Sequence, residues 1–180
     1  MGKVLDALDD RLIEWIGAQH VFFVASAPTE GGRVNVSPKG HDTLRVLGPT
    51  SVAYLDLTGS GAETIAHTRQ NGRITIMFCA FDGPPQILRL FGRGEAHPVG
   101  SDRYEELAPR FDAIPGARAV ITVEVERVQT SCGYSIPFMD HRGERPTLQQ
   151  WAVRQGDAGL AEYWAERNAT SIDGLPALGS

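Results

Sequence analysis

The residues best placed to do chemistry form a glycine-rich turn, Leu57-Thr-Gly-Ser-Gly-Ala-Glu-Thr64, which follows a short apolar segment. That segment, 51–57, is rich in strand-forming residues and predicts a buried β-strand. Ser60 and Glu63 have the spacing of a capping box, so a helix is expected to begin at the turn and to end at Asn71-Gly72. Free N–H groups at a helix start suit an anion such as phosphate, although plain helix capping explains the same residues.

A second candidate feature is the segment 33–39, in which polar and apolar side chains alternate. One face of the expected strand carries Val34, Val36 and Pro38, and the other carries Arg33, Asn35, Ser37 and Lys39. An edge strand with one solvated face would have this pattern, and so would a strand whose polar face lines a ligand cleft. The residues alone leave both interpretations open.

Other chemistries lack the necessary spacing. The five histidines are scattered, with no HExxH motif, and Cys79 and Cys132 form neither a disulfide framework nor a paired metal motif. No serine lies in a Gly-x-Ser-x-Gly elbow, and no nucleotide fingerprint follows the strand. His41 and Asp42 are adjacent in the sequence, but the sequence indicates no nucleophile that they could activate. The sequence therefore predicts no metal site and identifies no catalytic residue.

Composition narrows the class of protein. The 180 residues are expected to form one domain, 1–180, with 42% hydrophobic and 22% charged residues. A net charge of −5 argues against nonspecific binding to nucleic acid or to anionic membranes. No apolar run approaches the roughly 20 residues of a membrane helix. The first residues are acidic, unlike a signal peptide, so a cytoplasmic location is expected.

The elements that must position these residues are mostly strands. Strands are predicted near 20–27, 33–39, 51–57, 73–81, 86–97 and 118–129. An amphipathic helix is expected from Leu5 to Gln19, another over 101–112, and two short helices after Thr147, the first capped by Thr147 and Gln150. Residues 40–49 and 130–146 are expected to be loops, and 171–180 a loose tail. Strands of this spacing with hairpin turns predict an all-β or α+β barrel.

The order of several motifs resembles that of a known family. The motifs are Phe22-Phe-Val-Ala-Ser26, Val34-Asn-Val-Ser-Pro-Lys-Gly40, Tyr54 to Thr64, Arg89-Leu-Phe-Gly-Arg-Gly94, Ser131-Cys-Gly-Tyr134 and Ser171-Ile-Asp-Gly-Leu-Pro176. In this order they resemble the pyridoxamine 5'-phosphate oxidase-like family of flavin-binding proteins. The resemblance implies a mainly β, α+β fold, namely a six-stranded antiparallel split β-barrel with peripheral helices. It also implies a homodimer that binds FMN in two clefts between the subunits.

The resemblance implies where the cofactor lies. The flavin ring and ribityl chain would follow the polar face of strand 33–39, and the phosphate end would lie at the glycine-rich turn. The cofactor-binding residues implied in this way are Asn35, Val36, Ser37, Lys39, Leu57, Thr58, Ser60, Thr64 and Arg89. Lys39 would place positive charge near the ring or the substrate, because the family's cofactor strand also ends in lysine.

One departure from the family pattern concerns the phosphate. The Arg-Lys pair that holds it in the vitamin-B6 oxidases falls at Glu63 and Thr64 here, so Arg69, Arg89 or the second subunit would have to meet its charge. This disfavours true pyridoxamine-phosphate oxidation and keeps a deazaflavin open as the cofactor. The leading hypothesis is an FMN-dependent oxidoreductase with a small-molecule substrate. The alternatives are a non-catalytic flavin-, deazaflavin- or haem-binding protein of the same fold, and a structural dimer with an empty cleft.

Overall fold

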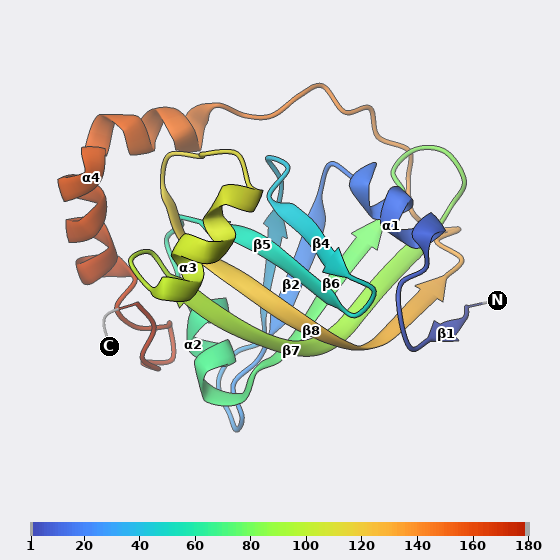
Figure 1. The fold of residues 1–180 in the computed structure, drawn as a ribbon, viewed down its shortest axis with the longest axis horizontal. Helices are drawn as coiled ribbons and strands as arrows, with labels where there is room; N and C mark the ends of the chain where they lie inside the picture. Colours follow the sequence, from blue (N-terminus) through green and yellow to red (C-terminus); the bar gives the residue numbers. More distant parts are fainter. Residues whose placement is uncertain (1, 179–180) are drawn as a thin grey trace.

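The computed structural model describes residues 2–178 and consists mainly of one antiparallel sheet with helices around it (Figure 1). The strands are β1 (Val4–Leu5), β2 (Phe22–Ser26), β3 (Asn35–Lys39), β4 (Leu44–Gly48), β5 (Ser51–Leu57), β6 (Arg73–Cys79), β7 (Ile87–Pro98) and β8 (Ala117–Ser131). The helices are α1 (Asp10–Gly17), α2 (Glu63–Asn71), α3 (Asp102–Leu107) and α4 (Thr147–Arg167), and a 3₁₀ turn, Ala108–Arg110, follows α3.

The sheet of the described residues has eight strands in the order β3-β2-β6-β7-β8-β5-β4, with β1 added to β8. All pairings are antiparallel, and β3 and β4 form the two edges of the seven-strand path. The sheet curls around a core but is not closed by hydrogen bonds, so the edge strand β3 faces the β4–β5 end of the sheet across a split. The predicted mainly β, α+β fold is confirmed, with an open sheet of eight strands in place of six.

Alternate residues of each strand point to the same face of the sheet. The apolar face of the strands turns toward the inside of the curled sheet and forms the core. Its buried members include Val24, Tyr54, Ile76, Leu90 and Ile121. A second, smaller cluster packs α3 against the outer face of β5 and β8, through Leu55, Leu107, Phe111 and Val120. The close approach of β7 and β8 requires Gly92, since a Cβ there would collide with the carbonyl oxygen of Glu124 at a bulge.

Two elements near the start of the chain differ from expectation. The predicted loop 40–49 contains β4, which forms a hairpin with β5 and packs Leu44 and Val46 against the core. The first helix does not begin at Leu5, which lies in β1. It begins at Asp10, because the side chain of Asp9 accepts a hydrogen bond of 2.8 Å from Leu12 N–H and caps the helix there.

The capping box predicted at Ser60 and Glu63 is wrong. The N-cap of α2 is Ala62, without a side-chain cap, and Glu63 is the first helical residue. The Glu63 carboxylate instead accepts a hydrogen bond of 2.8 Å from Ile172 N–H, in the C-terminal segment. A tertiary contact has therefore taken the place of the local one. The predicted end of α2 is confirmed, since Gly72 adopts a left-handed φ of 70°.

The C-terminal region is more ordered than expected. The two predicted short helices are present within α4, where the non-helical Gly156 (φ 65°, ψ 176°) separates them at a kink. The cap predicted at Thr147 is absent because Pro146 occupies the N-cap. The predicted loose tail is packed against the rest of the protein as far as it is described, since Ser171 and Ala177 are buried. Residues 179–180 of that tail lie outside the described range. Between β8 and α4, residues 132–146 cross the top of the view in Figure 1 without a helix or strand.

Candidate functional site

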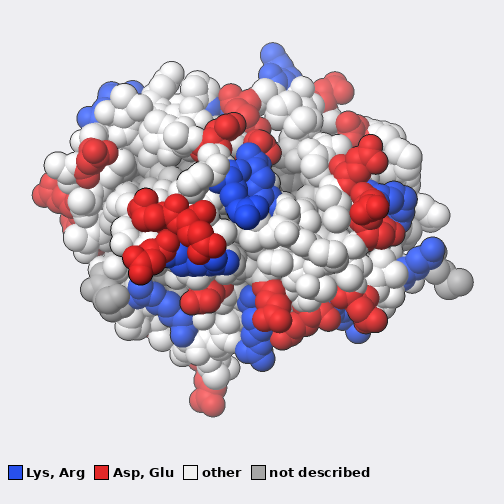
Figure 2. Space-filling view, viewed as in Figure 1, with Lys and Arg blue, Asp and Glu red and all other residues white. Residues whose placement is uncertain are grey.

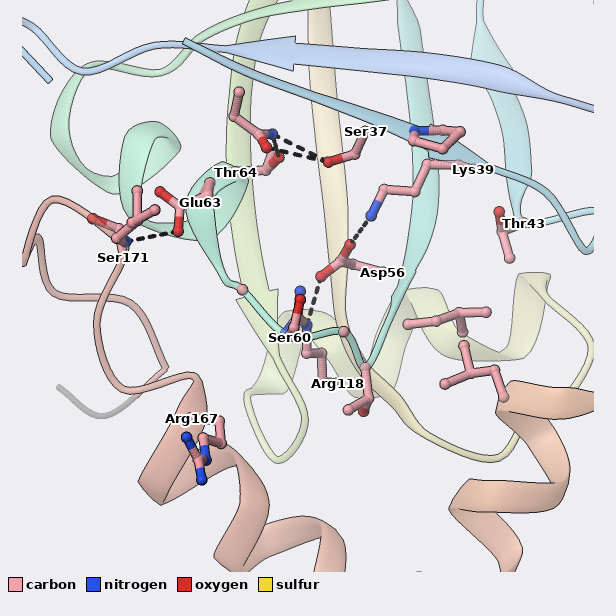
Figure 3. Close-up of a pocket in the computed structure, with 18 of the residues that line it drawn as sticks. Ser37, Lys39, Thr43, Asp56, Ser60, Glu63, Thr64, Arg118, Arg167 and Ser171 are labelled. Atoms are coloured by element: carbon pink, nitrogen blue, oxygen red, sulfur yellow. Dashed lines mark hydrogen bonds and ion pairs between the residues drawn. The ribbon is translucent and has the colours of Figure 1, made fainter. Parts of the chain in front are cut away.

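A cavity of about 910 Å³ opens at the split between β3 and β5. Its walls come from the polar face of β3, the end of β5 with the turn before α2, the start of β8, and the C-terminal region (Figure 3). The C-terminal contribution consists of Leu148, Glu166, Arg167, Thr170, Ser171 and Ile172. The cavity is therefore built by segments from most of the chain.

Most of the predicted cofactor-binding residues line this cavity: Asn35, Ser37, Lys39, Leu57, Thr58, Ser60 and Thr64. Two do not line it. Val36 points away from it, with 61% of the residue exposed. Arg89 lies on β7, where Nη1 donates a hydrogen bond of 3.2 Å to Ser131 Oγ. A role in cofactor binding stays a prediction for all nine residues.

The floor of the cavity carries two cations on one carboxylate. Lys39 Nζ lies 2.7 Å from Asp56 Oδ1, and Arg118 Nε lies 2.8 Å from Asp56 Oδ2. Asp56 is buried, with 1% of its side chain exposed, so the carboxylate depends on these two partners. Burial raises the pKa of the Asp56 carboxyl, but Lys39 and Arg118 together lower it by more. The resulting pKa lies below the ordinary value for aspartate. Asp56 is thus ionised at neutral pH.

The end of α4 holds both this floor and the glycine-rich turn. Buried Asn168 accepts a hydrogen bond of 2.7 Å from Arg118 Nη1 and donates one of 3.0 Å to the carbonyl oxygen of Gly59. Trp164 Nε1 donates to Thr58 Oγ1 at 2.8 Å. The turn is therefore fixed by tertiary hydrogen bonds as well as by its own backbone.

A neutral polar cluster lies on the wall between the floor and α2. Asn35 Nδ2 lies 3.2 Å from Ser37 Oγ and 3.3 Å from Thr64 Oγ1, and all three side chains are partly shielded or buried. The cluster connects β3 to α2. It offers amide and hydroxyl groups that can both donate and accept hydrogen bonds to a ligand.

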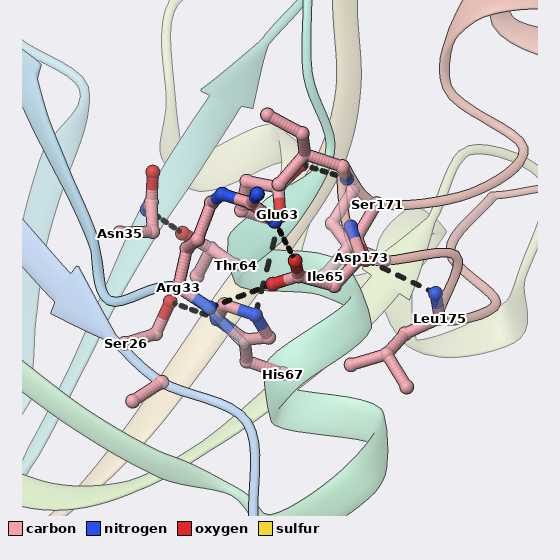
Figure 4. A network of polar contacts seen from close by, with 12 residues as sticks. Ser26, Arg33, Asn35, Glu63, Thr64, Ile65, His67, Ser171, Asp173 and Leu175 are labelled. Atoms are coloured by element: carbon pink, nitrogen blue, oxygen red, sulfur yellow. Dashed lines mark hydrogen bonds and ion pairs between the residues drawn. The ribbon is translucent and has the colours of Figure 1, made fainter. Parts of the chain in front are cut away.

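The C-terminal segment docks on α2 through a second polar network (Figure 4). Glu63 Oε1 accepts from Ile172 N–H, whereas buried Glu63 Oε2 has no hydrogen-bond partner among the described residues and lies 4.0 Å from His67 Nε2. His67 is fully buried and bonded to Ser26 Oγ at 3.0 Å; burial lowers its pKa, so it is neutral at pH 7. Asp173 pairs with Arg33 on the other side of the segment.

Sequence reasoning missed Asp56 and Arg118, which the fold brings together on the cavity floor, and the cavity wall around Arg167. One signal was present: Asp56 interrupts an otherwise apolar buried strand, and a buried carboxylate requires a cation or several donors. The position of that cation was not visible, because Arg118 is 62 residues away. The contribution of the C-terminal region had no local signal.

Within residues 2–178, no group of three or more histidine, cysteine, aspartate or glutamate side chains is arranged to hold a metal ion. None of the described helices is long and apolar enough to span a membrane.

On the face shown in Figure 2, acidic and basic side chains are interspersed and form no large field of one sign. Among the described residues, the cavity at the split is large enough for a sizeable ligand, whereas the hollow near α1 and β4 measures about 290 Å³.

Known proteins match this chain over most of its length. Residues 8–132 match the family model described as pyridoxamine 5'-phosphate oxidase. The pyridoxamine 5'-phosphate oxidase family protein ustO of Aspergillus flavus is 42% identical, covering 97% of this chain and 77% of its own.

Solved structures show the same fold at low identity. A variant of HupZ from Group A Streptococcus matches with a TM-score of 0.53 and 21% identity, covering 68% of this chain and 98% of its own. A candidate pyridoxamine 5'-phosphate oxidase from Lactobacillus delbrueckii matches with a TM-score of 0.53 and 17% identity, covering 69% of this chain and 94% of its own. Together with the family match and the 42% identical relative, the fold leads to one conclusion. The chain belongs to the pyridoxamine 5'-phosphate oxidase family.

Proposed function

We propose that the protein is a cytoplasmic, FMN-dependent oxidoreductase that acts on a small molecule. The observation that carries this proposal is the distribution of groups along one cavity. The glycine-rich turn before α2 lies at one part of the wall, and the Lys39 ammonium lies on the floor. Because α2 begins at Glu63, the N–H groups of its first turn have no acceptor within the helix. A flavin nucleotide needs this combination of a phosphate-binding turn and a cation near the ring.

The residues of the cavity fit FMN in size and in chemistry. A volume of about 910 Å³ lies near the upper end of the usual range for small-molecule sites. The phosphate would lie at Ser60 and the N–H groups of the turn. The ribityl chain and the ring edge would meet the polar cluster of Asn35, Ser37 and Thr64.

The acidic residue beside the turn does not prevent this arrangement. One oxygen of Glu63 is held by the N–H of Ile172, which reduces its repulsion toward a phosphate. Arg33 and Arg167 also line the cavity, so a phosphate has cations nearby that the sequence comparison with the vitamin-B6 oxidases did not identify. Arg167 is the more available of the two, because Arg33 is bonded to Asp173, whereas the ion pair of Arg167 within residues 2–178 is a 3.5 Å contact with its exposed neighbour Glu166.

Bound FMN would supply the hydride chemistry, so the protein need not supply an acid or a base. Lys39 would hold positive charge beside the ring or a substrate anion. The polar cluster would orient the ring, and the C-terminal wall around Ile172 would limit the access of water. A deazaflavin would use the same groups.

We further propose that the protein is a homodimer with a cofactor cleft at each subunit contact. The edge strand β3 presents Val36 on the side away from the cavity, and Val34 lies just before the strand at the cavity rim; these residues are 61% and 73% exposed. Exposed apolar residues on an unpaired edge strand favour contact with another chain. A second copy covering this strand would also close the open side of the split.

The absorbance of the purified protein, followed by titration of the apoprotein with FMN, tests the proposed function. We expect a flavin spectrum and a saturable shift of that spectrum on binding. A Soret band would instead indicate a haem-binding protein, and a colourless protein that binds neither FMN nor a deazaflavin would refute the proposal. Reduction of the bound flavin by NADH or NADPH in a single turnover would separate an oxidoreductase from a protein that only stores flavin.

A further inference from the structure

Lys39 is held at the cavity floor by a buried carboxylate on a strand that does not pair with its own. We propose that Asp56 and Arg118 are positioning residues for Lys39, and that these three residues set a net positive charge that selects a ligand with an anionic group at this point. The identity of the ligand rests on the proposed function. The positioning of Lys39 does not depend on that function.

The ion pair between Lys39 and Asp56 bridges the split in the sheet. In the strand order, β3 lies at one edge and β5 lies next to the other edge, so no backbone hydrogen bonds join them. Figure 3 shows the Lys39 side chain extending from β3 toward Asp56 across the cavity. Because lysine has a long and flexible side chain, this ion pair is what fixes the ammonium there.

The second cation on the carboxylate cannot take the place of the first. Arg118 uses Nε for Asp56 and Nη1 for Asn168, and 5% of its side chain is exposed. Its two-point attachment fixes the guanidinium group and leaves Asp56 Oδ1 for Lys39. Of the two cations on Asp56, Lys39 is the more exposed, with 18% of its side chain accessible, and it is the one that can reach a ligand.

The charges at the floor do not cancel. Two cations share one carboxylate, which leaves an excess of one positive charge at Lys39. The Tyr54 hydroxyl adds no charge to this sum, because burial keeps it neutral by raising its pKa; its ring lies 5.8 Å from Lys39 Nζ.

A fixed cation with excess charge favours an anionic partner over a neutral one of the same shape. The partner would be a carboxylate or phosphate of a substrate, or the edge of a flavin ring that becomes anionic on reduction. Both sources share the chemistry of an anionic oxygen or nitrogen group. They differ in whether the effect of Lys39 appears in the reduction potential of the cofactor or in the binding of a second anion.

The lysine content of the chain allows a direct test of positioning in the apoprotein. Lys3 and Lys39 are the only lysines, so lysine labelled with ¹³C at the ε position gives two signals, and Lys39→Met assigns them. We expect the Lys39 signal to be broader than that of Lys3 and to narrow in Asp56→Asn, which removes the carboxylate that holds the ammonium. In Arg118→Met the ion pair remains but its carboxylate is less firmly held, so the signal should narrow by less. Asp56→Ala removes the same carboxylate without adding a lysine, and it carries the test if Asp56→Asn does not fold. An unchanged Lys39 signal in the folded variants would overturn the proposed positioning.

Titration with FMN tests whether Asp56 acts through Lys39. Lys39→Met and Asp56→Asn should each weaken FMN binding or lower the reduction potential of bound FMN, with losses of affinity of about 10-fold or more. The double variant should bind about as well as Lys39→Met alone, because Asp56 has no ammonium left to position. If the two losses are additive in the double variant, the proposal is contradicted. Glu106→Gln, which removes an exposed carboxylate paired with Arg103, is the matched control and should change neither quantity.

Two further arms identify the source of the anionic group. If it belongs to the cofactor, the reduction potential falls in Lys39→Met, and acetate has no effect on the flavin spectrum. If it belongs to a substrate, acetate or inorganic phosphate perturbs the spectrum of the wild-type holoprotein but not that of Lys39→Met. The absence of both effects would overturn the proposed selection of an anion. A wild-type protein that takes up no FMN would refute the proposed function alone, since the lysine signals still report the positioning.

Discussion

Replacing Lys39 by methionine should destabilise the apoprotein by an amount that depends on pH. Methionine keeps most of the apolar stem and removes the ammonium group, which lies 2.7 Å from Asp56. Breaking a fully buried ion pair costs about 3–5 kcal/mol, and losing a hydrogen bond to a charged group costs about 1.5–3 kcal/mol. Because Arg118 still neutralises the carboxylate, we expect the lower range, about 2 kcal/mol at pH 7.

The direction of the pH dependence follows from the pKa of Asp56. Burial raises that pKa, but the two cations lower it by more, so in the folded protein it lies below the ordinary value of about 3.9. A depressed carboxyl pKa adds stability above the unfolded-state pKa, and this stability is lost as the pH falls through the folded-state pKa. Lys39→Met raises the folded-state pKa. The difference in stability between the wild type and the variant should therefore be greatest above about pH 4 and shrink in stronger acid.

Urea unfolding of both apoproteins at fixed ionic strength, at several pH values between about 7 and 3, measures this difference. Lys3→Met is the matched control, since it removes the other lysine from an exposed position and should change stability by no more than about 0.5 kcal/mol. A loss in Lys39→Met that equals the control at neutral pH would refute the reasoning. So would a loss that is as large in strong acid as at pH 7.

Three other variants test separate parts of the structure. Glu63→Gln should leave FMN affinity unchanged or improve it. The amide oxygen of glutamine still accepts a hydrogen bond from Ile172 N–H, while a negative charge beside the phosphate is removed. A large loss of affinity in an FMN titration would show that the carboxylate is itself a ligand. Trp164→Phe should weaken FMN binding severalfold at constant fold, because it removes one of the hydrogen bonds that hold Thr58 in the turn; unchanged affinity would show that the turn does not need this hydrogen bond from α4. Val36→Asp should convert the proposed dimer into a monomer in light scattering, and a wild-type mass near 19.5 kDa would contradict the dimer itself.

The sequence by itself determined six of the eight described strands, all but β1 and β4, and the family. Period-two alternation predicted β3 with its polar face on one side, and the side chains of that face now line the cavity. The Asn71-Gly72 signal predicted the end of α2 correctly, because a left-handed glycine terminates a helix through local geometry. These features depend on neighbours within a few residues. A single sequence is enough to predict them.

Only the tertiary structure decided which charges meet on the cavity floor and which group forms a hydrogen bond with Glu63. Asp56 meets cations from residues 17 and 62 positions away, and nothing in the apolar strand around it indicates which ones. Glu63 has the spacing of a capping box, yet it bonds to a backbone N–H 109 residues away. A local hydrogen bond and a distant one are worth similar free energies, so packing of the C-terminal segment against α2 determines which of them forms. The outcome of that competition cannot be predicted from spacing alone.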